Sequence, residues 1–112
     1  MAPQVARDRI VLSGSVLDER GAAVGGVIVG VYGSASMTGA PVFTGPPTRP
    51  DGSFELELRT PGRYYPAARS RFDGPPLSGE VYGLLRGVEG SGLELVEGQR
   101  ITDLVFVARP VP

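Results

Sequence analysis

Hydrophobic and polar residues alternate strictly in the middle of the chain. In an extended backbone, Phe54, Leu56 and Leu58 would lie on one face, and Glu55 and Glu57 on the other. A period of two residues with one apolar and one charged face is typical of a half-buried antiparallel β-strand. The sequence therefore predicts a strand here, with its three apolar side chains in the core.

Two turn-forming dipeptides flank this strand, an Asp-Gly pair at 51–52 and a Pro-Gly pair at 61–62. Proline presets one backbone angle of a tight turn, and glycine tolerates the positive angle that such turns need. Residues 64–69 are then predicted to run back as the second strand of a hairpin. This pairing would place Tyr64 across from Phe54 as a core aromatic whose hydroxyl reaches the rim.

Further apolar runs predict strands at 10–17, 27–32, 42–44, 93–96 and 101–108. A Pro-Pro pair at 46–47 would end the short run at 42–44 and leave it at the edge of a sheet. Residues 71–92 are expected to form a long irregular segment. No stretch has a convincing 3.6-residue period, so little or no helix is expected. About seven short strands at this spacing favour an all-β fold, a single β-sandwich.

Composition agrees with one small domain of short strands and tight turns. The 112 residues include 17 glycines and 11 prolines, and 41% of them are hydrophobic. The net charge of −1 comes from evenly spread charges, which argues against nucleic-acid binding. No apolar run predicts insertion into a membrane or a signal peptide at the start. The expected organisation is an N-terminal arm at 1–9, the domain at 10–109 and a C-terminal tail at 110–112.

Five residue types are absent from the chain: Cys, His, Trp, Lys and Asn. Without Cys and His, the usual ligands of zinc, haem and copper are missing, so no metal or other cofactor is expected. The serines lack a histidine or lysine that could act as a base, so no catalytic residues are proposed and no enzymatic activity is expected.

Several turn and core motifs occur in order along residues 10–109. They are Leu12-x-Gly14-x-Val16-x-Asp18-x-x-Gly21-x-x-Val24-x-Gly26-Val27-x-Val29-x-Val31, Asp51-Gly52-Ser53-Phe54, Pro61-Gly62-x-Tyr64, Glu97-Gly98-Gln99 and Leu104-x-Phe106. This pattern resembles the carboxypeptidase regulatory-like domain. The resemblance implies a transthyretin-like, Ig-like Greek-key β-sandwich of seven strands. It also implies a non-catalytic module that is secreted, periplasmic or on the cell surface, as in bacterial surface proteins.

Two kinds of ligand site can be tested on the residues. Loop carboxylates could bind calcium, but they lack the spacing of a calcium loop and are better explained by turns and solubility; they are Asp18, Glu19, Asp51, Asp73 and Glu80. Exposed aromatics could stack on sugars, and the candidates are Tyr32, Tyr65, Phe72 and Tyr82. Packing in the core is the simpler interpretation of each aromatic.

Outward-facing apolar residues mark a candidate interface. If Leu104 and Phe106 face the core, Val105 and Val107 point outward in the last strand, as Val11 and Leu17 do in the first. The resemblance places these two strands side by side, so the four residues would form an apolar stripe. In the alternative interpretation, the segment at 71–92 folds over this face through Leu77, Val81, Leu84 or Leu85. The stripe favours an accessory or assembly module that binds a protein partner or itself. A carbohydrate- or small-ligand-binding module is the alternative.

Overall fold

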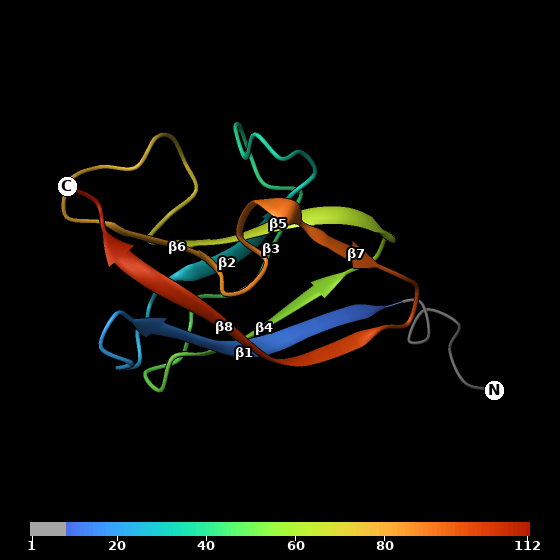
Figure 1. Ribbon diagram of the computed structural model, residues 1–112, viewed down its shortest axis with the longest axis horizontal. Helices are drawn as coiled ribbons and strands as arrows, with labels where there is room; N and C mark the ends of the chain where they lie inside the picture. Colours follow the sequence, from blue (N-terminus) through green and yellow to red (C-terminus); the bar gives the residue numbers. More distant parts are fainter. Residues whose placement is uncertain (1–8) are drawn as a thin grey trace.

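The computed structural model describes residues 9–112, which form an all-β domain (Figure 1). Within this range the chain has eight strands, a 3₁₀ turn η1 (Glu89–Ser91) and no α-helix, which confirms the expected all-β class. The strands are β1 (Ile10–Asp18), β2 (Ile28–Tyr32), β3 (Phe43–Thr44), β4 (Ser53–Leu58), β5 (Gly62–Arg69), β6 (Val81–Leu85), β7 (Leu93–Leu95) and β8 (Arg100–Pro110). The arm expected at 1–9 lies outside the described residues except for Arg9.

The strands are joined in the order β3-β2-β5-β6-β8-β1-β4, and β7 pairs with the first half of β5. The first and last strands are parallel neighbours, and the other pairs are antiparallel. The expectation that β1 and β8 lie side by side is therefore confirmed. Figure 1 shows these two strands running together along one side of the domain.

The sheet curls on itself until it is almost a closed barrel, so the expected sandwich of two separate sheets is wrong in this respect. The first and last strands of this order are β3 and β4, and the segment that follows β3 comes close to β4. A Cβ atom on Gly45 would lie only 2.8 Å from the carbonyl oxygen of Glu55 in β4. Pro46 and Pro47 follow directly, and proline has no N–H to donate across the seam. The barrel therefore approaches closure here, and the prolines cannot complete its hydrogen-bond ladder.

The predicted hairpin between residues 53–59 and 64–69 is wrong. β4 pairs with β1, for example Phe54 with Gly14, whereas β5 pairs with β2, β6 and β7. The short connection at residues 59–61 carries the chain from one end of the strand order to its middle, and Gly62 of the expected Pro-Gly turn already belongs to β5. Alternation predicts which face of a strand is buried, but the strand's partner is set by contacts distant in sequence. The buried face itself is as predicted.

Residues 71–92 are also more regular than expected, because they contain β6. This strand lies between β5 and β8, with Leu84 opposite Ala67 on one side and Val107 on the other. The remaining predicted strands exist with shifted ends, and β3 lies at an edge as its following prolines predict.

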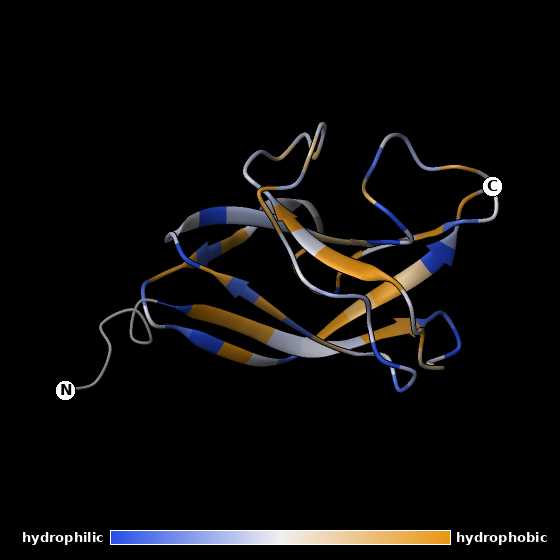
Figure 2. Cartoon of the chain, turned by 180° about the vertical axis from the view of Figure 1, so that it is seen from behind, coloured by the Kyte–Doolittle hydropathy of each residue, from blue (hydrophilic) through white to orange (hydrophobic). Residues whose placement is uncertain are grey.

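The core fills the barrel interior with side chains from every strand except the two-residue β3, whose Phe43 packs against it from the edge. Figure 2 shows hydrophobic and hydrophilic residues alternating along the strands. Phe54 and Phe106 pack edge to face with ring centroids 5.4 Å apart. Tyr64 is buried and donates its hydroxyl proton to the Thr60 carbonyl at 2.7 Å, as expected of a core aromatic with a polar tip.

Candidate functional site

The outer face of β6, β8 and β1 carries a row of apolar side chains. In the strand register, Val107 lies opposite Leu84 of β6 on one side and Leu17 of β1 on the other. Neighbouring strands are about 4.8 Å apart, so these three side chains lie next to one another across the sheet. All three are partly exposed, whereas Phe106 and Ala108, which alternate with Val107, are buried.

The other two residues of the predicted stripe differ from each other. Val105 lies two residues from Val107 on the same face, opposite Ser15, and is partly exposed. Val11 is only 7% exposed and lies between Glu57 and Arg100 in the register. Val11 therefore offers little surface, and the apolar row is completed by Leu84, one of the residues through which the alternative interpretation would cover this face.

The alternative, in which residues 71–92 cover this face, does not describe the structure. Leu84 lies within the sheet beside Val107, so it widens the row. Leu85 is buried in the core, Val81 lies in the sheet and packs against the core, and Leu77 is 53% exposed. We call Leu17, Leu84, Val105 and Val107 the apolar row.

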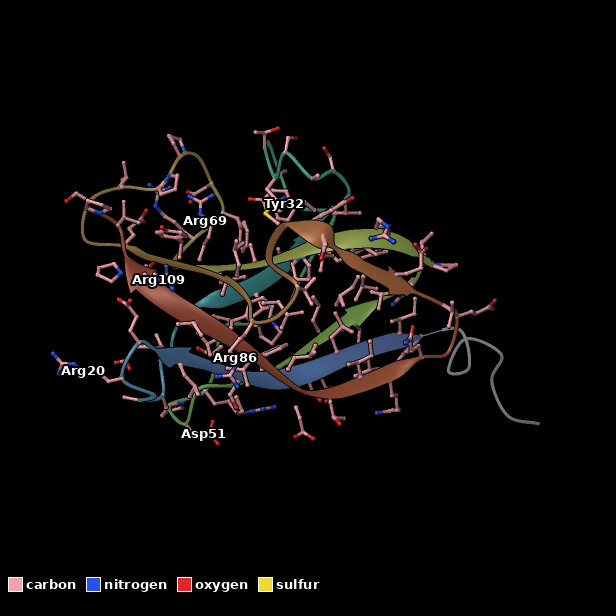
Figure 3. The ribbon with its side chains drawn as sticks, in the orientation of Figure 1. Arg20, Tyr32, Asp51, Arg69, Arg86 and Arg109 are labelled. Carbon is pink, nitrogen blue, oxygen red and sulfur yellow. The ribbon has the colours of Figure 1, made fainter. Side chains whose placement is uncertain are left out.

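A shallow groove of about 320 Å³ lies along β6 and β8 at this row. Leu84 and Val107 line its middle, and two exposed arginines, Arg86 and Arg109, lie toward its ends. Figure 3 shows Arg109 near the C-terminal end of β8 and Arg86 farther back along the same pair of strands. Arg109 also forms a long ion pair with Glu19, at 3.6 Å, in which both side chains are more than half exposed.

Two of the four candidate aromatics are brought together beside a second depression. The rings of Tyr32 and Phe72 meet edge to face at 5.9 Å, and the Arg69 guanidinium lies 5.5 Å from the Phe72 centroid. An open cleft of about 600 Å³ adjoins them, lined also by Met37 and by Pro75 of the loop before β6. Tyr32 is only 4% exposed, so its ring face is largely used in packing.

The other two aromatics lie apart from this pair. Tyr65 is opposite Tyr32 in the register, but its ring packs at Gly92, where an added Cβ atom would be 2.8 Å from the ring. Tyr82 is 41% exposed and lies between Arg69 and Arg109 across three strands. The four rings therefore do not form one exposed platform.

Asp73 and Glu80, two of the carboxylates weighed for calcium, are both bonded to Arg71. Their distances to its guanidinium are 2.7 Å and 2.6 Å. The Arg71 hydrogen bond lowers the pKa of Asp73, and the Leu77 backbone N–H, followed by Arg71, lowers the pKa of Glu80. These carboxylates serve to hold the loop before β6.

Asp18 and Asp51 close turns. Asp18 accepts hydrogen bonds from the backbone N–H groups of Ala22 and Arg20, which lower its pKa. Asp51 accepts from the hydroxyl and the N–H of Ser53, with the same effect on its pKa. Across residues 9–112, no three acidic side chains gather as a metal site would require.

No protein-family model matches the chain, and no curated protein matches it either. In the described part of the chain, no helix combines the length and apolar character needed to cross a membrane. The arginines of the groove were not predicted from the sequence, because Arg86 follows the unpredicted strand β6 and Arg109 lies just beyond the predicted end of the last strand. The signal available was the spacing of Tyr82, Leu84 and Arg86, which alternate with glycine and leucine.

Proposed function

We propose that the domain is a non-catalytic contact module that binds a segment of another protein through the outer face of β6, β8 and β1. The observation that carries this proposal is that the partly exposed Leu84, Val107 and Leu17 lie next to one another across three adjacent strands. A contiguous apolar area on a small domain is a common mark of a partner surface. An isolated exposed side chain would carry no such meaning.

The resemblance to the carboxypeptidase regulatory-like domain belongs to the same proposal. The parallel pairing of β1 with β8 and the turn positions of the quoted motifs support a transthyretin-like, Greek-key relationship, while the near closure of the sheet departs from an open sandwich. Under this assignment the module acts as an accessory part of a secreted, periplasmic or cell-surface system.

The test is a selection of displayed random twelve-residue peptides on the folded wild-type domain. Selected peptides should bind wild type and fail to bind the double variant V105E/V107E, because two carboxylates would interrupt the apolar row. Circular dichroism should show the double variant folded, since neither valine is in the core. Peptides that bind both proteins equally, or a double variant that unfolds, would contradict the proposal.

Light scattering on the same two proteins examines self-association. A wild-type assembly that the double variant loses would identify a second copy of the chain as the partner. A monomeric wild type would direct the search to a different protein.

Small-ligand or carbohydrate binding is the second candidate, and the cleft beside Tyr32 and Phe72 favours it. An array of soluble oligosaccharides would test it. If the domain binds sugars at this cleft, wild type and V105E/V107E should bind the same oligosaccharides, and Phe72→Ala should not bind them. The low exposure of Tyr32 makes it the weaker of the two candidates.

A further inference from the structure

The groove along β6 and β8 has a regular pattern of side chains. The two strands are antiparallel, and three successive outward-facing pairs are Tyr82 with Arg109, Leu84 with Val107, and Arg86 with Val105. The first two pairs are register partners, and the third is fixed by the Arg86 N–H, which donates to the Val105 carbonyl at 2.8 Å. The apolar pair therefore lies between two pairs that each contain one arginine.

The distance between the arginines follows from this register. Arg109 is four residues beyond Val105, the partner of Arg86, so the two cations are separated along the strands by about 13 Å. In an extended peptide, residues i and i+4 are also about 13 Å apart, and residue i+2 points to the same side as both. An extended segment with carboxylates at i and i+4 and an apolar residue at i+2 matches the groove in charge and in spacing.

We infer that the groove binds an extended peptide segment of another protein with the pattern acidic-x-apolar-x-acidic. The apolar side chain packs on Leu84 and Val107, and the two carboxylates pair with Arg86 and Arg109. This inference rests on the proposed contact function and specifies the partner's chemistry. Arginine suits this role because its planar guanidinium can bind a carboxylate through two hydrogen bonds.

Arg109 can exchange its ion-pair partner Glu19 for a carboxylate of the bound segment. Its present ion pair with Glu19 is long, and the two side chains are 60% and 59% exposed. Exposed pairs of this kind contribute little to stability, so a partner carboxylate can replace Glu19 at small cost.

The sequence of this chain argues against a second copy as the occupant. Asp51 and Glu55 are its only two acidic residues separated by four positions, and the residue midway between them is Ser53, which is polar. No segment of the chain has the required acidic-x-apolar-x-acidic pattern. A second copy of these 112 residues therefore cannot supply the matching segment.

A synthetic peptide tests the pattern directly. The probe has nine residues with blocked ends, glutamates third and seventh, leucine fifth and threonine elsewhere. The control peptide has the same composition with the glutamates fourth and sixth, so that they face away from the side that carries the leucine. Titration into the folded domain, followed by amide NMR spectra, should show at least tenfold tighter binding of the probe and shifts centred on Leu84 and Val107. Equal binding of the two peptides would overturn the inference.

Charge reversal tests the arginines and provides a rescue. The variant R86E/R109E should bind the probe at least tenfold more weakly, and it should bind better than wild type to a peptide in which arginines replace the glutamates. The matched control R59E/R100E changes the same charge on exposed arginines outside the groove and should bind as wild type does. Equal losses in both variants would mean unspecific attraction and would overturn the inference.

The remaining outcomes separate this inference from the proposed function. If selected peptides depend on Val105 and Val107 but lack paired acids, the contact function stands and the acidic pattern is wrong. The same conclusion follows if wild type assembles with itself through the apolar row. If no peptide depends on this face at all, both the function and its partner are contradicted.

Discussion

Gly14 lies so close to Leu104 that a Cβ atom at Gly14 would be 2.6 Å from the Leu104 nitrogen and would overlap its carbonyl oxygen. The cause is a bulge in β8. Leu12 pairs with Ile101 and Gly14 with Leu104, so the single residue of β1 between these pairs is matched by two residues of β8. Asp103, within the bulge, has a positive φ of 62°. The bulged backbone occupies the space that a side chain at position 14 would need.

Gly14→Ala should therefore destabilise the domain by about 1–3 kcal/mol, the usual cost of forcing extra volume into a packed site. Urea denaturation measures the change. Gly90→Ala is the control, because an added Cβ atom there meets nothing within 4 Å and the backbone needs no positive φ. A Gly14→Ala variant as stable as Gly90→Ala would contradict this account of the bulge.

Phe54→Ala should cost about 3–5 kcal/mol, because it removes a buried ring and its edge-to-face contact with Phe106. The neighbouring Glu55→Ala should change stability by less than about 0.5 kcal/mol, since Glu55 is exposed on the other face of β4. Chemical denaturation of both variants provides the comparison. A loss below about 1 kcal/mol for Phe54→Ala would be incompatible with the observed register of β4.

Among residues 9–112, Thr48 stands out as a polar residue that is buried. Its side chain connects the loop before β4 with the segment that leads into β2. Its hydroxyl donates to the Val24 carbonyl at 2.8 Å and accepts from the Val27 N–H at 3.1 Å. Thr48→Val keeps the shape but leaves both groups without their partner, so we expect a loss of about 1–3 kcal/mol. Thr48→Ser should retain most of the stability. Equal losses in the two variants would assign the effect to packing.

The unfolding free energy should fall as the pH is lowered from about 5. Asp18, Asp51, Asp73 and Glu80 have pKa values below their ordinary 3.8 or 4.5 in the folded state. A depressed folded-state pKa stabilises the fold above the unfolded pKa, and this contribution is lost as the pH falls through the folded value. Urea titrations between about pH 7 and 2 measure the slope.

Arg71→Met should flatten part of this acid slope, because Arg71 is the first cause of the shift at Asp73 and a secondary cause at Glu80. The part of the acid slope that comes from the hydrogen bond of the Leu77 N–H to Glu80 should remain. Arg59→Met serves as the control, since Arg59 is no cause of any of the resolved shifts. An acid slope unchanged by Arg71→Met would contradict the assignment.

What could be predicted from the sequence was local. Alternation placed Phe54, Leu56 and Leu58 in the core, and parity placed Val107 on the outer face, because side-chain direction depends only on neighbouring residues. Strand pairing depends on contacts between distant residues, so the partner of β4 was predicted wrongly. For the same reason the groove could not be predicted, since only the register of β6 and β8 places Arg86 and Arg109 at the two ends of one groove.

The parallel pairing of β1 and β8 determines how the domain would respond to mechanical load. Parallel neighbours start at the same end, so the beginning of β1 and the end of β8 lie at opposite ends of the pair. A pull applied at Ile10 and Pro110 would slide one strand along the other and strain the hydrogen bonds between them simultaneously. These bonds would share the load, whereas strands pulled apart from one end would lose their bonds one at a time.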